Sequence, residues 1–558
     1  MKILALHCDY INFKPLKKAL KEPEEIDKKE VKVKECLVVF TAVEKRDEGK
    51  DVLKLYLKAI KEISNQVKTK TIVLYPYAHL SSDLSSPSFA EQILKDAEKN
   101  LKGFKVIRAP FGWYKEFTLK CKGHPLSELS REITSEGLKE VKADYKQLLR
   151  QVLKTKLDTS KLKENDHRVL GQKLDLFSFH DVAPGMIFWH DKGLILRDEI
   201  IKFWREEHRK AGYKEILTPQ IMDKKLWQIS GHWDKYSENN FVTEYEKRTF
   251  LVKPMNCPGG MLVYKNTPKS YKDLPLRVGE LGTVHRQELS GVLGGLFRVV
   301  QFTQDDAHIY CTEKQLEEEV VKIIDLISLF YKKFKLPYRV ELSTRPKKRI
   351  GSDSDWNKAE KVLENVLKKK KIQYKLNKGD GAFYGPKIDF HVTDSLKREW
   401  QTATIQLDFA MPERFDLEYT DENNTKQRPV VLHRTVLGAL GRFIGILLEH
   451  TNGHLPTWLA PVQVRVISFT DRNIKASEKI LKELIDLGIR VDSDFENDTI
   501  GKKIREAEVQ RIPYTLVIGD KEEKAKTVAV RSSGKKPEFG VKLEKFIKEI
   551  KEEIEERK

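Results

Sequence analysis

The stretch RVGELGTVHRQELSGVLGGLFRVVQFTQDDAHIY, residues 277–310, decides the fold of the central part of the chain. Two strand-like runs flank a glycine-rich segment, which predicts an antiparallel hairpin with an extended turn. Because side chains alternate along a strand, Arg286 and Glu288 should share one face, and Arg298 should return from the far side of the turn. Two such arginines can bind a phosphate, and a carboxylate beside them can accept from an adenine amino group. An isolated Arg-x-Glu is more typical of a ladder of ion pairs on the surface of a strand than of a phosphate site.

A second stretch, VLHRTVLGALGRFIGILLEH (residues 431–450), places one arginine among apolar residues. The pattern predicts a glycine-punctuated helix with Arg442 inside it. A buried guanidinium needs an anionic partner, because an unpaired buried charge is costly. The partner is either an internal carboxylate or a triphosphate, and these residues alone leave both open.

The flanking sequence predicts further α/β blocks. Residues 194–221 predict a long helix that stops at Gly212, then a strand, then Pro219. Residues up to about 145 alternate strand-like and amphipathic helical runs, and residues 138–173 predict a lysine-rich helical connector. The last block predicts strands and helices in turn, with strands at 462–469, 489–492, 514–518 and 527–531 and helices at 476–487, 500–511 and 542–556.

Composition limits the class of protein. The chain has 558 residues, of which 40% are apolar and 34% charged, and it has no apolar run long enough to cross a bilayer. The formal charge is +19, which suits a polyanionic partner or a lysine- and glutamate-rich thermophile-like surface. Five cysteines at uneven spacing and no expected signal peptide predict a reducing, cytoplasmic location and no membrane.

Together these stretches resemble the three signature motifs of class II aminoacyl-tRNA synthetases. The helix and strand ending at Pro219 resemble motif 1, HRQE (285–288) resembles motif 2, and GALGR (438–442) resembles motif 3. Within the class, KPMNCPGG, FTQDDAHIY, GAFYGPKIDF, WQTATIQLDF and LPTWLAPVQV are similar to threonyl-tRNA synthetases. The N-terminal block resembles the editing domain of the archaeal members, which looks like a D-aminoacyl-tRNA deacylase.

The resemblance implies a multidomain α/β and α+β chain. It divides into a deacylase-like α/β editing domain (1–145), a helical linker (146–173), a class II catalytic core with an antiparallel sheet (174–460) and an α/β anticodon-binding domain (461–558). Motif 1 forms the subunit interface in this class, so a homodimer is expected.

The implied zinc ligands are Cys257, His308 and His433. Their spacing fits no metal motif, but one Cys and two His form a good zinc set and leave a coordination position open. Zinc bound by both the amino group and the hydroxyl of threonine would reject valine, which an apolar pocket rejects only about a hundredfold. The other residues implied in the amino-acid pocket are Asp306, which would bind the hydroxyl, and Gln304, Tyr384, Gln401 and Gln406. Gly260 and Ala439 depart from the bacterial pattern, where His and often Ser stand.

The implied reaction has two steps. ATP and L-threonine give threonyl-adenylate, and the acyl group then passes to the 3′ end of tRNA(Thr). Catalysis would consist of positioning and charge stabilisation. Arg286 would hold the α-phosphate, Arg442 the γ-phosphate with Arg298 assisting, and Glu288 would bind adenine. Mg²⁺ would bridge the phosphates of ATP.

Serine shares both zinc-binding groups of threonine and lacks one methyl, worth only ~1–3 kcal/mol, so hydrolytic editing of Ser-tRNA(Thr) is expected. The matching editing residues are His79, Lys122 and His124. The positions that match the anticodon readers of the family are Asn497, Arg505, Arg511, Glu522 and Arg531. Each of these could instead be an ordinary surface residue.

Two rival interpretations remain. One is a prolyl- or seryl-tRNA synthetase, against which the Cys257, His308 and His433 set argues. The other is a catalytically inactive paralogue that binds RNA, against which the retained arginines and the zinc set argue. Amino-acid-dependent pyrophosphate exchange and metal analysis would discriminate among them.

Overall fold

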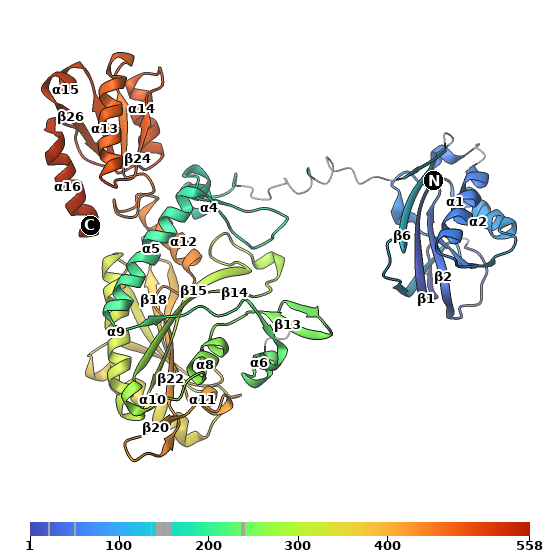
Figure 1. The fold of residues 1–558 in the computed structure, drawn as a ribbon, viewed down its shortest axis with the longest axis horizontal. Helices are drawn as coiled ribbons and strands as arrows, with labels where there is room; N and C mark the ends of the chain where they lie inside the picture. Colours follow the sequence, from blue (N-terminus) through green and yellow to red (C-terminus); the bar gives the residue numbers. More distant parts are fainter. Residues whose placement is uncertain (21–22, 49–51, 135–136, 141–148, 150–158, 236–239) are drawn as a thin grey trace. The chain divides into compact units, whose positions relative to one another are not determined.

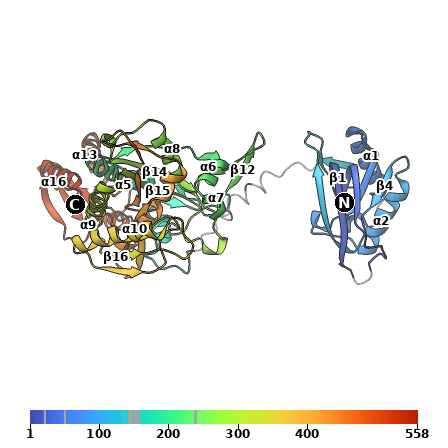
Figure 2. The same ribbon diagram turned by 90° about the horizontal axis from the view of Figure 1, so that it is seen from below.

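The computed structural model describes the chain except residues 21–22, 49–51, 135–136, 141–148, 150–158 and 236–239. It divides into two compact units, Met1–Arg150 and Gln151–Lys558. Figures 1 and 2 show the two units as ribbons. Each unit has its own apolar core. None of the helices in the described part of the chain is long and apolar enough to cross a membrane.

The N-terminal unit is one mixed sheet with two helices. The sheet order is β4-β3-β2-β1-β6-β7, with β5 also paired to β1. The elements are β1 (Lys2–Lys18), β2 (Val31–Ala42), α1 (Val52–Gln66), β3 (Thr71–Pro76), α2 (Pro87–Asn100), β4 (Lys105–Arg108), β5 (Trp113–Cys121), β6 (Glu128–Thr134) and β7 (Gly137–Glu140). Both helices lie on the same side of the sheet in Figures 1 and 2, because α1 and α2 connect the parallel strands β2, β3 and β4.

The predicted hairpin forms the centre of the larger unit. Strand β14 (Leu276–His285) pairs antiparallel with β15 (Gln301–Cys311). The full sheet has the order β10-β14-β15-β22-β19-β18-β16-β17. Its other strands are β10 (Lys214–Glu215), β16 (Tyr338–Ser343), β17 (Tyr374–Asn377), β18 (Lys387–Thr393), β19 (Glu399–Asp408) and β22 (Val430–Thr435). Only the two outermost pairs are parallel.

The long helices that contribute apolar side chains to the main core of this unit are α5 (Asp191–Lys210), α9 (Leu316–Lys333), α10 (Asp353–Lys369) and α12 (Leu440–Thr451). The smaller elements are α4 (His167–Lys173), β8 (Phe177–Ser178), β9 (Phe188–Trp189), β11 (Ile221–Asp223), α6 (Lys224–Ile229), α7 (His232–Lys235), β12 (Val242–Tyr245), β13 (Arg248–Val252), α8 (Cys257–Lys265), α11 (Ala410–Arg414), β20 (Tyr419–Thr420) and β21 (Lys426–Gln427).

Residues 461–558 form a further sheet with the order β24-β23-β25-β26-β27. Its elements are β23 (Val464–Ser468), α13 (Ile474–Asp486), β24 (Val491–Asp494), α14 (Ile500–Val509), β25 (Tyr514–Ile518), α15 (Asp520–Ala525), β26 (Thr527–Ser532), β27 (Glu538–Lys542) and α16 (Leu543–Glu555). All seven elements predicted for this block are present, and the prediction missed α15 and β27. Arg490 pairs with Glu199 of α5 at 2.8 Å, so this sheet contacts the catalytic core.

Two local predictions were wrong. Residues 430–435 form strand β22, and the helix α12 begins only at Leu440, because the apolar run is satisfied by sheet pairing before Gly438 turns the chain at φ +76°. The predicted connector helix was wrong for part of its length, since Gly137–Glu140 is a strand and residues 159–166 are turns and bends, whereas α4 (His167–Lys173) is helical as expected. Residues 141–148 and 150–158 of the connector lie outside the described part.

A fully buried ion pair joins the motif 1 segment to the sheet. Lys253 Nζ donates to Glu280 Oε1 at 2.8 Å, and the side chains are 0% and 1% exposed. The same oxygen accepts from the backbone N–H of Thr218 at 2.9 Å and from its hydroxyl at 2.7 Å. Removing one member of such a pair leaves a buried charge without compensation.

We therefore expect Glu280→Ala to lower the free energy of unfolding by about 3–5 kcal/mol. Seven of the eight tryptophans lie in the larger unit, so tryptophan fluorescence in a urea titration reports this change. Glu318→Ala is the matched control, because Glu318 pairs with Lys322 on an exposed face of α9. A midpoint for Glu280→Ala equal to that of the control would contradict the role of the pair.

Candidate active site

One cavity of about 610 Å³ collects nearly all the residues predicted for catalysis. Its lining includes residues of β15, β19 and β22, residues of the segment that connects β14 to β15, and Arg442 in the first turn of α12. The predicted residues that line it are Cys257, Arg286, Glu288, Arg298, Gln304, Asp306, Tyr384, Gln401, Gln406, His433 and Arg442. His308 lies beside the cavity among the metal-binding candidates.

Cys257, His308 and His433 lie together at one end of this cavity. Strands β15 and β22 place His308 directly opposite His433, and Cys257 is the first residue of α8. One ligand atom from each residue lies within 4.8 Å of the other two, and all three residues are buried.

The chemistry of these three side chains fits a zinc ion. His308 Nε2 is buried and has no hydrogen-bond partner within the described residues, and burial holds the pKa of His308 well below its usual value, so a neutral nitrogen is available. Burial raises the pKa of the Cys257 thiol well above its usual value, so a thiolate there needs a cation beside it. His433 Nε2 bonds Asp408 at 2.8 Å, the carboxylate support common for metal-binding histidines.

The amino-acid side of the cavity is polar and buried. Burial raises the pKa of Asp306 to about 6, and the nearby His433 and Asn256 oppose that shift. Asn256 Nδ2 donates to Asp306 at 3.3 Å. Tyr384 donates its hydroxyl proton to Gln406, which lies opposite His433 in the sheet.

Gln401, in contrast, is already engaged by protein groups. Its side-chain amide donates to Asp389 at 2.6 Å and to Thr404 at 3.3 Å. It therefore lines the cavity with its donors directed at β18 and β19.

Three arginines, Arg286, Arg298 and Arg442, also line this cavity. Arg298 pairs with Glu288 at 2.9 Å. Arg286 donates to the carbonyl of Pro254 at 3.1 Å, and Arg442 donates to the carbonyl of Phe297 at 2.9 Å. Burial, then the charge of Arg298, lowers the pKa of Arg442, with Glu288 acting in the opposite direction.

The arrangement of these arginines suits a bound anion. Within the part of the chain that the structure describes, neither Arg286 nor Arg442 forms an ion pair with a carboxylate. The internal ion pair considered for Arg442 is therefore not formed there. The positive charge is held by backbone carbonyls and stays available to a bound phosphate.

Sequence reasoning missed several residues that support the cavity. Asp305 is fully buried and accepts from the backbone N–H groups of Val436, Leu437 and Gly438 at 2.8–3.0 Å. It also accepts from Trp204 Nε1 at 3.1 Å. The alternation of faces along QDDAH could have separated Asp305 from Asp306, but no local pattern indicates its partners.

In the N-terminal unit, Lys122 and His124 lie near each other. Lys122 pairs with Asp9 at 2.6 Å and with Glu35 at 2.9 Å. His124 Nε2 lies 2.8 Å from His7 Nδ1. The sequence had not singled out His7, Asp9 or Glu35, whose partners are distant in the chain.

The tautomers of that histidine pair follow from one backbone contact. The N–H of Leu126 donates to His124 Nδ1 at 3.3 Å, so the proton of His124 sits on Nε2 and is donated to His7. His79 lies in a short exposed 3-10 turn, Ala78–Leu80, with its ring 5.4 Å from that of Tyr77. Among the described residues, no hydrogen bond or ion pair joins His79 to Lys122 or His124.

The predicted anticodon positions lie on several elements of the C-terminal sheet domain. Asn497 and Arg505 are exposed in and before α14, and Arg531 lies on β26. Glu522 accepts from the N–H of Gly519 at the start of α15. Arg511 instead lies at the junction with the catalytic core, where it lines a small cavity with Gly453 and Leu455.

Family models match three parts of the chain. Residues 1–133 match the archaea-specific editing domain of threonyl-tRNA synthetase. Residues 241–451 match the class II tRNA synthetase core domain shared by the G, H, P, S and T enzymes. Residues 463–553 match an anticodon binding domain.

Curated relatives and solved structures agree with these matches. Threonine–tRNA ligases of Desulforamulus reducens and Acetivibrio thermocellus are each 54% identical, over 395 and 396 residues respectively, which cover 71% of this chain and 62% of each relative. The chain thus spans about 62% of the length of these relatives. The crystal structure of the RNA binding domain of threonyl-tRNA synthetase from Cryptosporidium parvum is 41% identical, with a TM-score of 0.68 over 69% of this chain and 98% of that one.

A putative threonyl-tRNA synthetase from Aeropyrum pernix is 29% identical, with a TM-score of 0.63 over 70% of this chain and 97% of that one. The antiparallel sheet, the arginine pair and the motif 3 helix define a class II aminoacyl-tRNA synthetase core. Within that class, the chain belongs to the threonyl-tRNA synthetase family. The expected multidomain fold class is confirmed.

The two neighbouring aspartates of β15 should respond oppositely to the same substitution. Asp305→Asn replaces an acceptor by a donor facing backbone N–H groups, and we expect a loss of about 1–3 kcal/mol. Asp306→Asn should cause no loss at pH 7.5. Burial raises the pKa of both carboxyls, that of Asp306 to about 6, so each charged carboxylate opposes folding at that pH. The two residues differ in their partners: the Asp305 carboxylate accepts four hydrogen bonds from the protein, whereas among the described residues that of Asp306 accepts one, from Asn256.

Urea titrations in buffer with EDTA measure both variants without a contribution from bound metal. Equal destabilisation by the two substitutions would contradict the interpretation that Asp305 stabilises the fold whereas Asp306 serves the cavity.

Proposed function

We propose that the chain is a threonine–tRNA ligase with hydrolytic editing of Ser-tRNA(Thr). It would activate L-threonine with ATP and transfer the acyl group to the 3′ end of tRNA(Thr). The single observation that carries the proposal is the meeting, in one cavity, of a Cys/His/His set with three arginines. The first group suits an amine and a hydroxyl, and the second suits a triphosphate.

Cys257, His308 and His433 would hold the zinc ion. When bound, zinc would supply a Lewis acid with an open position for the amino and hydroxyl groups of threonine. Asp306 lies against this set and can accept the hydroxyl proton of the substrate in a hydrogen bond. Gln304, Tyr384, Gln401 and Gln406 would line the rest of the amino-acid pocket.

The arginines would bind ATP, and Mg²⁺ would accompany the phosphates. Arg286 would hold the α-phosphate, where negative charge develops as the threonine carboxylate attacks, so its fixed guanidinium stabilises the transition state. Arg442 would hold the γ-phosphate with help from Arg298. Glu288 pairs with Arg298 in this structure. When the phosphates of ATP bind Arg298, Glu288 would be free to accept a hydrogen bond from the adenine amino group.

The tRNA would bind through the C-terminal sheet domain. Asn497, Arg505 and Arg531 offer hydrogen-bond donors, and Glu522 offers an acceptor, to the edges of splayed anticodon bases. The packing of Arg511 at the junction with the core favours a role in fixing the domain as well as in contacting RNA.

We also propose a homodimer through the motif 1 segment. Leu217 and Ile221, on either side of Pro219, are 76% and 55% exposed. Exposed apolar groups of this size beside a short edge strand are typical of a protein interface. Light scattering coupled to size exclusion would test the dimer, and a monomer at micromolar concentration would refute it.

Editing would take place in the N-terminal unit. Hydrogen bonds to Asp9 and Glu35 raise the pKa of Lys122, so Lys122 would remain an ammonium and act by charge. It could orient the seryl ester or stabilise the oxyanion formed during hydrolysis. His124, tied to His7, and His79 would complete the pocket.

Amino-acid-dependent ATP–pyrophosphate exchange tests the assignment directly. Threonine should support exchange, serine should do so more weakly, valine should be at least about 1000-fold poorer in kcat/KM, and proline should be inactive. Exchange with proline alone would favour another synthetase of the class. Absence of exchange with every amino acid would favour an inactive RNA-binding paralogue.

Cys257→Ala should lose the zinc ion and threonine-dependent exchange together, because two imidazoles bind zinc much more weakly than the full set. Mass spectrometry of the metal content gives the stoichiometry independently of activity. Cys311→Ala is the matched control, since Cys311 is also buried in the larger unit but lies outside the cavity. Full zinc content in Cys257→Ala would exclude this residue as a ligand.

Lys122→Met should slow deacylation of Ser-tRNA(Thr) by about 100-fold or more and leave threonine activation unchanged. The reason is the loss of the fixed ammonium beside the ester. Lys99→Met, on the exposed face of α2, serves as the control. Normal deacylation by Lys122→Met would remove this lysine from the editing site.

A further inference from the structure

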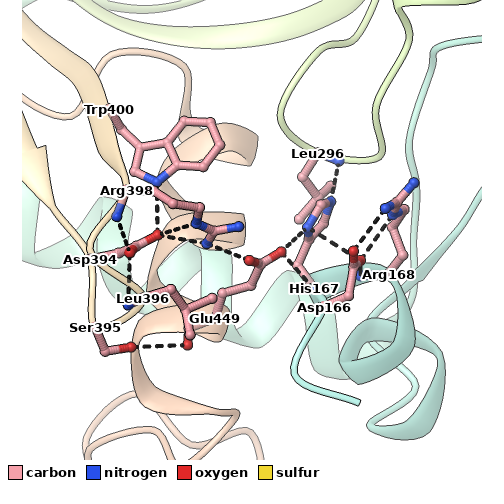
Figure 3. Close-up of polar contacts among 10 residues, drawn as sticks. All are labelled: Asp166, His167, Arg168, Leu296, Asp394, Ser395, Leu396, Arg398, Trp400 and Glu449. Atoms are coloured by element: carbon pink, nitrogen blue, oxygen red, sulfur yellow. Dashed lines mark hydrogen bonds and ion pairs between the residues drawn. The ribbon is translucent and has the colours of Figure 1, made fainter. Parts of the chain in front are cut away.

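His167 occupies a buried position behind the nucleotide end of the cavity. It is the first residue of α4 and is 1% exposed. Its Nδ1 lies 2.6 Å from Glu449 Oε1, in the last turn of α12. Its Nε2 lies 2.9 Å from the backbone nitrogen of Leu296, in the connection between β14 and β15. Figure 3 shows the ring between these two partners.

The backbone contact decides the tautomer of His167. An amide N–H can only donate, so Nε2 must accept from Leu296 and the ring proton must sit on Nδ1. That proton is donated to Glu449, whose Oε1 also accepts from the backbone N–H of His167 at 2.9 Å. Both ring nitrogens are therefore committed, one to each side of the ring.

Glu449 is itself held in place from its other side. Arg398 donates to Glu449 Oε2, and its Nε donates to Asp394 at 2.7 Å (Figure 3). Asp394 also accepts from Trp400 Nε1 at 2.9 Å. Trp400 lies on β19, so the network runs from α4 through α12 to the central sheet.

The loop segment beside His167 has almost no free space. Gly295 has φ +55°, and a Cβ added there would lie 2.2 Å from His167 Nε2. The ring of Phe297 lies 4.1 Å from that of His167. On the opposite side, a Cβ at Gly445 of α12 would meet Phe297 at 3.0 Å and Leu296 at 3.2 Å. Residues 295–297 are therefore clamped between His167 and α12.

This clamped segment forms part of the cavity. Leu296, Phe297 and Arg298 all line it. The carbonyl of Phe297 accepts from Arg442 Nε at 2.9 Å, and Arg298 pairs with Glu288. A shift of the segment would thus move Arg298 itself and the carbonyl group that orients the guanidinium of Arg442.

The cluster is not arranged as a metal site, although Asp166, His167 and Glu449 have ligand atoms within 4.8 Å of one another. His167 uses both ring nitrogens for protein partners. Asp166 is bound by Arg168 at 2.7 Å and caps α4 by accepting from the N–H of Arg168. The lone pairs that a metal would need are already used.

We propose that His167 is a positioning residue for ATP: it holds the returning limb of the motif 2 loop, residues 295–298, in the conformation that presents Arg298 and Arg442 to the phosphates. The inference rests on the proposed activation reaction. It makes the KM for ATP depend on a side chain that never contacts the nucleotide.

Two substitutions separate the two hydrogen bonds of the His167 ring, to Glu449 and to Leu296. His167→Asn keeps a donor near the position of Nδ1 but is too short to reach Leu296, and we expect the KM for ATP in pyrophosphate exchange to rise about tenfold, the effect of one lost hydrogen bond. The KM for threonine should stay within about twofold. His167→Gln restores an acceptor at the reach of Nε2 and should recover most of the ATP affinity.

The matched control is His450→Asn. His450 is the neighbour of Glu449 in α12, but it lines a different cavity, with Pro456 and Tyr514. Isothermal titration of ATP and a urea titration accompany the kinetics. If His167→Asn fails to fold, Gly295→Ala tests the inference instead. Its methyl group would collide with the His167 ring and should raise the KM for ATP but not that for threonine.

The outcomes are distinct. If the wild-type chain shows no threonine-dependent exchange, the proposed function fails, and the inference fails with it. If the wild type is active and His167→Asn keeps the wild-type KM for ATP, the inference alone fails. A parallel rise in both KM values, or no recovery in His167→Gln, would show that His167 serves only general stability and would also overturn it.

Discussion

The cavity of the larger unit depends on one buried carboxylate, that of Asp305. Asp305 accepts three consecutive backbone N–H groups of residues 436–438 and the indole N–H of Trp204. These bonds fix β15 against β22 and set the point at which α12 begins. A shift of one residue in a strand would turn every side chain to the other face. With the register fixed, His308 lies opposite His433 and the first turn of α12 carries Arg442 toward the cavity.

The second constraint is electrostatic. If the cavity binds a triphosphate, as proposed, its arginines must stay positively charged and free of carboxylate partners, yet buried charges are costly. Here backbone carbonyls hold the guanidiniums of Arg286 and Arg442, which orients each group while its net charge remains. Among the described residues, the one carboxylate paired with the three arginines of the cavity is Glu288, which binds Arg298 and is the residue proposed to bind adenine. Preorganised charge of this kind needs no rearrangement during the reaction.

Local sequence patterns predicted those strands and helices whose formation depends mainly on nearby residues. The hairpin of β14 and β15 and the seven elements after residue 461 follow from periodicity and turn residues. The strand at 430–435 was mistaken for helix because a buried apolar run has no distinguishing period. Cys257, His308 and His433 could be grouped only by family resemblance. The register of β15 and β22 places the two histidines opposite each other, and α8 places the cysteine beside them. Lys253, Glu280 and His167 were missed because their partners are distant in sequence.

The two proposed sites share one chemical strategy. In the larger unit, guanidiniums held by fixed acceptors face the position of the phosphates, and in the N-terminal unit Lys122 is held as an ammonium by Asp9 and Glu35. An ammonium bound by two carboxylates cannot serve as a general base, so in the proposed editing reaction Lys122 would act by its charge. Under the proposed function, accuracy would depend on geometry. Zinc ligands would detect the hydroxyl in the larger unit, and the N-terminal unit would hydrolyse the serine ester that the first site cannot exclude.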